Sequence, residues 1–354
     1  MDFGTDRVLV TGATGWLGRR LVESLVHGLP DVDALRTPQA GLRVRCLVAP
    51  GQDGPGLKRL AGEGRIELVV GDVRQPAHCA SLVGGATGGI LIHLAGTSHP
   101  ARVREFYEVH VEGTKNVLDA AARAGVRRAV VATGTSACGA CPSRADRFDE
   151  SAPFHPYMHG GRSRMLMELA VRERGRSGAI EAVVVRAPFG YGPGPRPRLK
   201  QWFREIRDGR AMIVGDGKAP RSMTYVDNLC HGLMLAALVP QAAGQTYWIA
   251  DQRPSSIREA VDTVERLLET EFQQPCKHRR RRLPGAAADL AQLLDSGIEA
   301  LGSFPPGIHE LSRMNRTIAC NTGKAETELG YRAAVGLEEG LRRSLRWWLE
   351  NGGL

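Results

Sequence analysis

The chain has 354 residues, of which 42% are hydrophobic and 24% charged, and its formal net charge is +9. This length and composition allow a sizeable core and suit one large α/β domain or two joined ones. No run of about 20 apolar residues occurs, so we expect no membrane partner, and the first residues lack the layout of a signal peptide. Seven scattered cysteines predict reduced thiols and a cytoplasmic location.

The first half of the chain alternates apolar strands with amphipathic helices. Strands are predicted at 7–10, 43–48, 66–70, 89–94, 129–132 and 181–185. Helices are predicted at 17–26, 103–124 and 161–174. Such alternation predicts a parallel, doubly wound sheet whose ligands bind at the carboxyl ends of the strands.

Beyond residue 190 this rhythm is lost, because prolines interrupt it. Helices are predicted at 199–208, 226–238, 257–269 and 337–349, with a short strand at 246–249. We therefore predict an α/β fold with a Rossmann-type doubly wound parallel sheet and a smaller mixed C-terminal substrate lobe. The dinucleotide-binding domain is expected over 1–190 and the substrate-binding lobe over 191–354, with the chain crossing between the two.

Two local features are interpreted as structural. The basic run 277–282 has no interleaved aromatic residues, so we interpret it as a solvated edge or surface strand and expect no nucleic-acid partner. Cys138 and Cys141 form one C-x-x-C pair without a second pair or histidines at ligand spacing. We interpret them as loop thiols and predict no metal site.

A glycine-rich turn follows the first predicted strand, with the sequence Thr11-Gly12-Ala13-Thr14-Gly15-Trp16-Leu17-Gly18. Gly12 allows a sharp turn from strand to helix, Gly15 lets the backbone approach a pyrophosphate, and Gly18 lets the helix pack on its strand. The helix N-terminus offers unpaired N–H groups to phosphates. The turn therefore predicts a dinucleotide-binding site.

The residue after the second strand normally selects between NAD and NADP. An acidic residue binds the ribose hydroxyls of NAD, and a basic one accepts the 2′-phosphate of NADP. Ala49 stands near this place and does neither. We expect NADP or NAD, and the missing acid favours NADP, with Arg45, Lys58 or Arg59 as candidate phosphate partners.

Several ordered motifs resemble those of the extended short-chain dehydrogenase/reductases, which include nucleotide-sugar epimerases and 3β-hydroxysteroid dehydrogenases. These motifs are T-G-x-x-G-x-x-G at 11–18, G-D-[LV] at 71–73, H-x-A-[AG] at 93–96, N-V-x-G-T-x-N-[VL] at 110–117 with His110 replacing Asn, and R-x-x-x-x-Y-G-P-G at 186–194. The resemblance implies that a nicotinamide cofactor is bound by Thr11, Gly12, Thr14, Gly15, Trp16, Leu17, Gly18, Asp72, Val73, Leu94, Ala95, Gly96, Thr133, Arg164 and Pro188.

The chain departs from this family at the catalytic site. There, a Ser or Thr after the fifth strand binds the substrate oxygen, a Tyr about 25 residues later transfers the proton, and a Lys four residues on lowers the pKa of that Tyr. Thr135 matches the hydroxyl, but Gly160 stands at the Tyr position and Arg164 at the Lys position. Glycine has no proton to give, and arginine remains charged at neutral pH. The resemblance thus implies an atypical active site.

Several residues could supply the missing proton. Tyr157 lies one helical turn before Gly160, and a second register places Tyr157 itself at the Tyr position with Gly161 replacing Lys. That register spoils the spacing to Thr135. His159, His155 and His110 are further candidates, because imidazole titrates near neutral pH, although a loop histidine is more often merely exposed.

The loop 193–198 and Arg221 are the clues to substrate. A similar arginine precedes the corresponding segment in family members that bind nucleotide-sugar phosphates, and surface solubility explains the same residues equally well.

Three functions remain open at this point. The first is an NAD(P)-dependent oxidoreductase acting on a small organic carbonyl or alcohol, in which Thr135 holds the oxygen and Tyr157, His159 or water supplies the proton. The second is a non-redox enzyme of the same fold that catalyses dehydration, cyclisation or isomerisation with a structural NAD(P). The third is a nucleotide-sensing protein without catalysis. A homodimer through 103–124 and 161–174 is a further expectation.

Overall fold

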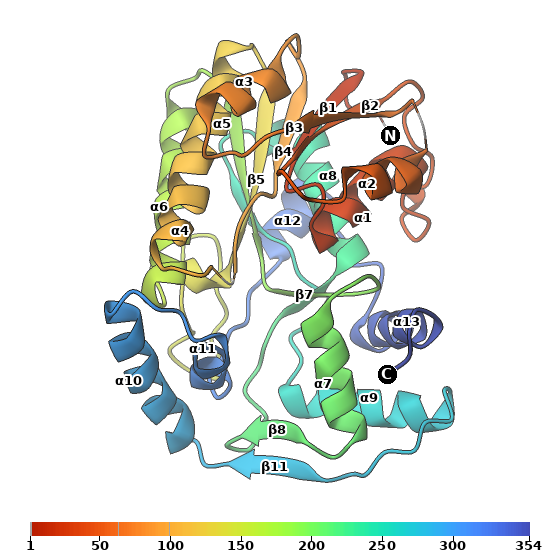
Figure 1. Ribbon diagram of the computed structural model, residues 1–354, viewed down its shortest axis with the longest axis vertical. Coiled ribbons are helices and arrows are strands. Elements are labelled where there is room, and N and C mark those ends of the chain that lie inside the picture. The colour runs from red at the N-terminus through yellow and green to blue at the C-terminus, as the bar shows by residue number, and fades with distance from the viewer. Residues whose placement is uncertain (1, 63, 99) are drawn as a thin grey trace.

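A seven-stranded parallel sheet forms the upper part of the molecule in the computed structural model, which describes residues 2–62, 64–98 and 100–354 (Figure 1). The strand order is β10-β6-β5-β4-β1-β2-β3. The strands are β1 (Arg7–Thr11), β2 (Arg43–Val48), β3 (Ile66–Val70), β4 (Ile90–His93), β5 (Arg128–Gly134), β6 (Glu181–Ala187) and β10 (Thr246–Trp248). The doubly wound parallel sheet predicted from the sequence is confirmed.

The central strands are apolar on both faces because helices cover both. Val8 and Val10 of β1 pack into one cluster with α1 (Trp16–His27) and α8 (Val226–Leu238). Leu9, between them, points to the opposite cluster. The helices on that second face are α3 (Pro76–Val83), α5 (Gly113–Arg123) and α6 (Met158–Arg176). Another helix of the first half, α2 (Gly54–Ala61), lies beside α1.

The chain beyond β6 adds two small parallel sheets and further helices, most of which lie in the lower part of Figure 1, whereas α12 lies higher, against β10 of the large sheet. The strand pairs are β7 (Phe189–Tyr191) with β9 (Met223–Tyr225) and β8 (Ala211–Val214) with β11 (Arg280–Leu283). The helices are α7 (Pro197–Arg207), α9 (Ile257–Thr270), α10 (Ala286–Ala300), α11 (Pro306–Arg313), α12 (Gly323–Glu328) and α13 (Leu337–Glu350).

The chain returns from this lower part to the large sheet, because β10 pairs with β6 and α8 covers one face. β11 contains Arg280, Arg281 and Arg282, the second half of the basic run, and pairs with β8 at the edge of its sheet, so the interpretation of this part of the run as an edge strand is confirmed. Arg280 is neutralised by Glu265 at 2.6 Å and by Asp262 at 2.5 Å.

Two predicted helices differ from the structure. The helix predicted at 103–124 is three segments: α4 (Arg104–Tyr107), a π-helical turn over Glu108–Glu112, and α5. Such turns widen the helix locally and occur often at functional sites. Helix α6 begins at Met158 rather than at residue 161, and Met158 has a φ of +52°. Left-handed backbone at a non-glycine residue is strained, and such strain clusters at functional sites.

The cysteines are packing residues. All seven have free thiols. Cys138 and Cys141 are buried in a cluster with Phe148 and Trp248, and burial raises the pKa of Cys138 to about 11. Cys138 is therefore a protonated core thiol at neutral pH. Over the described part of the chain, no helix is both long and apolar enough to span a membrane.

Candidate active site

The glycine-rich turn has a backbone that admits only glycine at its first position. Gly12 has a φ of +69°, and a Cβ there would stand 2.7 Å from backbone atoms of Leu94 and Ala95. A Cβ on Gly18 would stand 2.1 Å from the Gly12 carbonyl oxygen. These approaches leave a concave cradle of main chain between β1 and α1.

Helix α1 begins beside this cradle with its first amides uncapped by any side chain. Gly15 is the N-cap residue in extended conformation, and Leu17 lies in the first turn. A phosphate group satisfies such amides and the positive end of the helix dipole. The cradle and the uncapped helix therefore fit the pyrophosphate of a dinucleotide.

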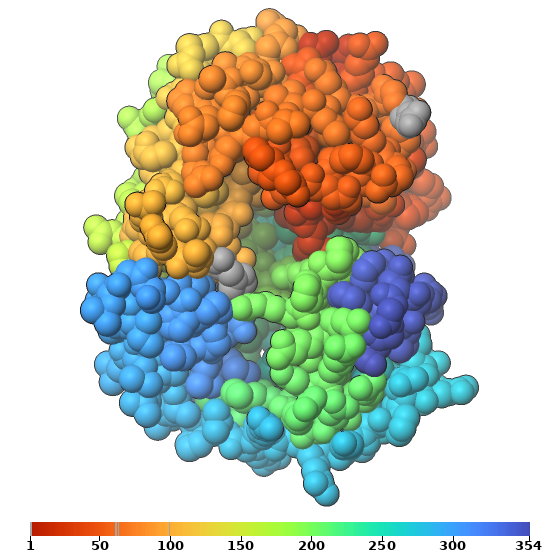
Figure 2. Space-filling view, viewed as in Figure 1, coloured from red at the N-terminus to blue at the C-terminus, as the bar shows by residue number. Residues whose placement is uncertain are grey.

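Trp16 connects the turn to the lower part of the molecule. Its indole Nε1 donates to the Pro193 carbonyl at 2.6 Å, and the Arg196 guanidinium lies 4.4 Å from its ring. Pro188 stands between β6 and β7 at the start of this crossing. The space-filling view shows a hollow between the upper and lower parts (Figure 2).

The hydroxyl of Thr11 connects the end of β1 to the end of β4 by hydrogen bonds. It bonds His93 Nδ1 at 2.6 Å and accepts from the amides of Leu94 and Ala95 at 3.2 Å. His93 Nε2 reaches Thr114 on α5 at 3.0 Å. Burial lowers the pKa of His93 to about 4. At physiological pH this histidine is therefore neutral, and its hydrogen bonds connect Thr11 to Thr114.

On the adenosine side, Asp72 and Val73 follow β3. Arg74 Nη2 contacts the Asp72 carboxylate at 2.6 Å and lowers its pKa. Val73 packs where a Cβ on Gly113 would approach it to 2.8 Å. Of the basic candidates for a 2′-phosphate, Arg45 is engaged by Glu67 at 2.7 Å. Lys58 and Arg59 are exposed on α2, and Thr14 bonds Gln52 in front of that helix.

At the end of β5, Thr133 has a structural contact. Its hydroxyl donates to Glu168 at 3.1 Å, and Glu168 forms a fully buried ion pair with Arg186 at 2.8 Å. Thr135 begins the following 3-10 turn, Thr135–Ala137, and is half-buried. Among the described residues no hydrogen bond engages its hydroxyl, which leaves it able to meet a ligand.

The position expected to carry the family's tyrosine is filled by another side chain. A Cβ on Gly160 would lie 3.4 Å from Phe106 Cζ, and the Phe106 ring packs edge-on against Phe304 with centroids 5.2 Å apart. A Cβ on Gly161 would lie 2.4 Å from the Ser136 carbonyl oxygen. The second register, with Gly161 at the lysine position, therefore has no room for that side chain.

Arg164 occupies the place expected for the lysine. Its Nη1 donates to Ser136 Oγ at 3.3 Å, and its Nε lies 3.8 Å from where a Cβ of Gly134 would stand. Burial, and then repulsion from Arg313, lower the pKa of Arg164 to about 10. It is still a cation at neutral pH.

Tyr157 is fixed on the same side of α6 by residues from α11. Its backbone amide donates to the Ser136 carbonyl at 2.9 Å, and its hydroxyl bonds Ser312 Oγ. The Ser312 hydroxyl donates its one proton to the His309 carbonyl at 2.7 Å. Tyr157 is therefore the donor in its hydrogen bond with Ser312. Burial is the largest cause that raises the pKa of Tyr157. The phenol is therefore a protonated acid at neutral pH.

The histidines point elsewhere. His159 Nδ1 bonds the Tyr107 hydroxyl at 2.7 Å. His110 Nδ1 bonds Ser163 at 2.8 Å and its Nε2 accepts from the Thr97 amide at 3.2 Å. Burial lowers the pKa of His110 to about 3, which removes it from proton transfer near pH 7. Gly96 packs against His110, and His155 is exposed.

Positive charge without an acidic partner gathers beside Tyr157. Arg164, Arg221 and Arg313 form no ion pair with any carboxylate of the described residues. Arg221 donates to the Arg313 carbonyl at 2.8 Å, and Arg313 lies 5.4 Å from the Tyr157 ring. Burial and repulsion from Arg313 lower the pKa of Arg221 to about 10. Such guanidinium groups favour an anionic ligand.

Sequence reasoning missed the residues that reshape this corner. Phe106 precedes the π-helical turn, and Ser312 and Arg313 come from α11 more than a hundred residues after Tyr157. No motif marks them. The structure brings Thr135, Tyr157 and Arg164 around Ser136 and turns His159 towards Tyr107.

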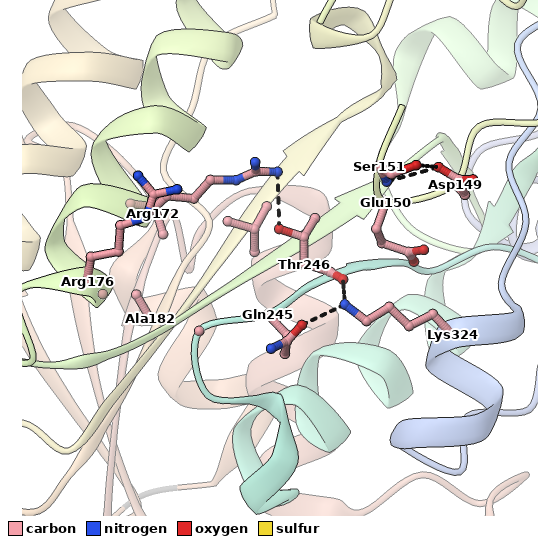
Figure 3. A pocket seen from close by; sticks show the side chains of 13 residues that line it. Asp149, Glu150, Ser151, Arg172, Arg176, Ala182, Gln245, Thr246 and Lys324 are labelled. Carbon is pink, nitrogen blue, oxygen red and sulfur yellow. Dashed lines mark hydrogen bonds between the residues drawn. The ribbon is translucent and has the colours of Figure 1, made fainter. Parts of the chain in front are cut away.

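A second cavity, of about 660 Å³, lies at the amino ends of β6 and β10. Figure 3 shows Lys324 Nζ donating to Gln245 Oε1 at 2.7 Å and Arg172 reaching Thr246 at 3.4 Å across it. Ligands of doubly wound sheets bind at the opposite, carboxyl ends of the strands. This cavity is therefore separate from the candidate active site.

Comparisons with known proteins agree with this architecture. The family model described as "NAD dependent epimerase/dehydratase family" matches residues 8–250. An uncharacterized protein, y4nL of Sinorhizobium fredii, is 41% identical over 98% of this chain and 96% of its own. A 4-hydroxy-2-methyl-3-oxo-4-farnesyl-3,4-dihydroquinoline-1-oxide ketoreductase of Stigmatella aurantiaca is 30% identical over 95% of this chain and 94% of its own.

Among solved structures, DesIV, a dTDP-glucose 4,6-dehydratase from Streptomyces venezuelae with NAD bound, is 26% identical with a TM-score of 0.75, covering 98% of this chain and 97% of its own. The predicted nicotinamide cofactor is thereby confirmed as the cofactor of the family, whereas the preference for NADP stays a prediction. The extended short-chain dehydrogenase/reductase resemblance is confirmed, and the chain belongs to the NAD dependent epimerase/dehydratase family of enzymes.

Proposed function

We propose that this protein is an NAD(P)-dependent oxidoreductase, of ketoreductase or dehydrogenase type, whose small carbonyl or alcohol substrate carries a negative charge. The observation that carries the proposal is the presence of two guanidinium groups near the Tyr157 phenol. Its neutral phenol stands beside the Arg313 guanidinium, 5.4 Å from the ring, and Arg164 is close enough to Arg313 to be repelled by it. A proton donor and two unpaired cations thus share one corner.

In this proposal the bound nicotinamide supplies or accepts the hydride, and the chain's own residues position the substrate and move the proton. The Thr135 hydroxyl donates to the substrate oxygen. The Tyr157 O–H rotates from Ser312 to that oxygen and protonates it during reduction. Arg313 and Arg164 stabilise the phenolate that remains and bind the substrate anion.

Relatives support the redox class. The Stigmatella relative is a ketoreductase by name, and a relative in Arabidopsis thaliana, 27% identical over 95% of this chain and 78% of its own, is a 3beta-hydroxysteroid-dehydrogenase/decarboxylase. One observation favours a second candidate, a non-redox enzyme with a structural dinucleotide. Gly160 stands at the position of the family's tyrosine with Phe106 packed beside it, so that position supplies no proton donor.

The substrate-binding role of residues 191–354 rests on Arg221 and Arg313, both from that part of the chain. A cytoplasmic location and a homodimer through the helices around 103–124 and 161–174 stay predictions.

The proposal is tested with NADH and NADPH and a panel of ketones, each supplied as the free carboxylate and as its methyl ester. We expect oxidation of the reduced nicotinamide, followed at its absorbance band, with a KM for the carboxylate at least tenfold below that of the ester. Equal KM values would remove the anionic substrate from the proposal. Tight nucleotide binding without oxidation by any ketone would favour the non-redox candidate.

A further inference from the structure

A cluster of three side chains able to ligate a metal joins α10 to α11, and these two helices lie below the start of α6 in Figure 1. Asp295 and Glu299 are neighbours on one face of α10, because they are one helical turn apart. His309 of α11 faces both: its Nδ1 is 2.9 Å from Asp295 Oδ2 and 3.8 Å from Glu299 Oε1. One ligand atom from each residue lies within 4.8 Å of the other two.

The carboxylates of this cluster are buried and incompletely satisfied. The Asp295 side chain is 0% exposed and the Glu299 side chain 2%. Glu299 Oε2 accepts from the His159 amide at 2.9 Å, which turns Oε1 towards His309. Within the described chain, neither Glu299 Oε1 nor Asp295 Oδ1 has a hydrogen-bond partner. Buried carboxylate oxygens are normally paired or bound to metal, because leaving them unpaired is costly.

A proton shared between the two carboxyl groups is the competing explanation, and a measurement of metal uptake distinguishes the two. Metal–nitrogen and metal–oxygen bonds of about 2.0–2.2 Å place adjacent ligands of a tetrahedral site roughly 3.4 Å apart. The separations of 2.9 and 3.8 Å from His309 Nδ1 lie on either side of this value.

We propose that Asp295, Glu299 and His309 bind a divalent first-row transition ion, Zn²⁺ or Mn²⁺. One imidazole nitrogen and two carboxylate oxygens suit these ions better than Mg²⁺ or Ca²⁺, which take oxygen ligands. The ion ties the α10–α11 hairpin to the first turn of α6 through the Glu299–His159 contact. It thereby holds α11, and with it Ser312 and Arg313, against Tyr157, whose ring lies 5.0 Å from that of His309.

Sequence analysis predicted no metal site, and the signal for this one is weak. An acidic pair at helical spacing followed ten residues later by histidine matches many exposed helices. This cluster differs from those exposed helices because both of its carboxylates are buried. No local sequence pattern predicts that burial.

The test is metal uptake by the chelator-treated full-length protein, titrated with ZnCl₂ and MnCl₂ by calorimetry and checked by elemental analysis. We expect one equivalent to bind, to raise the melting temperature, and to bind at least tenfold more weakly in D295N and H309Q. The matched control is D289N, which removes an exposed carboxylate from the same helix and should bind as the unaltered chain does.

E299Q serves as a further variant if D295N or H309Q fails to fold by circular dichroism. Absence of saturable uptake of either ion would overturn the proposal. Uptake of one equivalent with unchanged affinity in the folded variants would also overturn it, because the ion would then lie elsewhere. The measurement is independent of turnover, so its outcome does not depend on the proposed oxidoreductase function.

Discussion

The phosphate cradle follows β1 and the corner around Tyr157 follows β5, both at the carboxyl ends of their strands, yet the two are built differently. The cradle is main chain: Gly12 and Gly18 are required because a Cβ would collide with backbone 2.7 and 2.1 Å away. The corner around Tyr157, in contrast, is formed by side chains that come from α4, α6 and α11. A main-chain site leaves its mark as glycines at fixed spacing, whereas a side-chain site can be rebuilt by residues from anywhere in the fold.

The comparison also explains how the family's tyrosine could be absent. The cradle tolerates no larger residue at Gly12 or Gly18, because a Cβ at either position would collide with backbone atoms. At the corner, Phe106 fills the vacated space and Tyr157 stands one turn earlier, held by Ser312. Each prediction below tests one side of this contrast.

The largest effect is expected for Gly12→Val. The new side chain meets both a φ of +69° and the backbone at the end of β4, so affinity for NADH should fall by about 100-fold or more. Gly41→Val is the matched control, since Gly41 has a φ of +73° but nothing within 4 Å of its Cβ. Fluorescence titration of NADH measures both. Retained binding in Gly12→Val would show that the cradle is not the phosphate site.

The next effect concerns the unpaired cations. Arg313→Met should raise the KM for an anionic substrate about 10- to 100-fold, because charge-assisted hydrogen bonds are lost. The same variant should melt at a higher temperature, since an unpartnered buried charge is removed. Arg316→Met, an exposed arginine paired with Asp289 at 2.8 Å, should change neither quantity. A lower melting temperature for Arg313→Met would contradict an unsatisfied guanidinium.

The filled tyrosine position predicts coupling between two residues. Gly160→Tyr should destabilise the protein by about 1–3 kcal/mol because Phe106 occupies the space. Phe106→Ala also destabilises, but the double variant should lose less than the sum of the two, by roughly 1 kcal/mol. Denaturant unfolding gives the free energies. Gly297→Tyr, with nothing within 4 Å of its Cβ, is the uncoupled control, and strict additivity at Gly160 would mean that the position is empty.

The last prediction concerns the pH dependence of stability at His93, which acts only at acidic pH. Its folded pKa, about 4, lies below the unfolded value, so its contribution to stability is complete above about pH 6.5 and is lost as pH falls towards 4. One such group gives a slope of about 1.4 kcal/mol per pH unit in that window. In His93→Gln the free energy of unfolding should depend less steeply on pH between about 6.5 and 4, by the slope that one titrating group contributes. An unchanged slope would place the titration on other groups.

Much of the fold could be predicted from the sequence because the buried strands are continuous apolar runs and the turns carry glycine. The strands β1 to β6 lie where alternation placed them, and the cradle was read from its glycines. The π-helical turn at 108–112 was missed because its side-chain pattern is that of an ordinary helix. The start of α6 was placed too late, because the break at Met158 depends on strain in its backbone.

For the catalytic corner, the sequence predicted only that the family's tyrosine and lysine are absent. Gly160 and Arg164 stand out against the family's pattern, and Tyr157 was recognised as a neighbour. The roles of Phe106, Ser312 and Arg313 depend on contacts between segments distant along the chain. Such contacts leave no periodic signal, so only the three-dimensional arrangement assigns them.

The proposal that Tyr157 replaces the family's tyrosine as proton donor is tested most directly by single-turnover oxidation of bound NADH or NADPH with the best carboxylated ketone. We expect Tyr157→Phe to slow this step by at least about 100-fold without weakening nucleotide binding. His159→Gln, one turn along and bonded to Tyr107, should stay within a few-fold of the unaltered rate. A Tyr157→Phe variant that turns over at the full rate would contradict the claim.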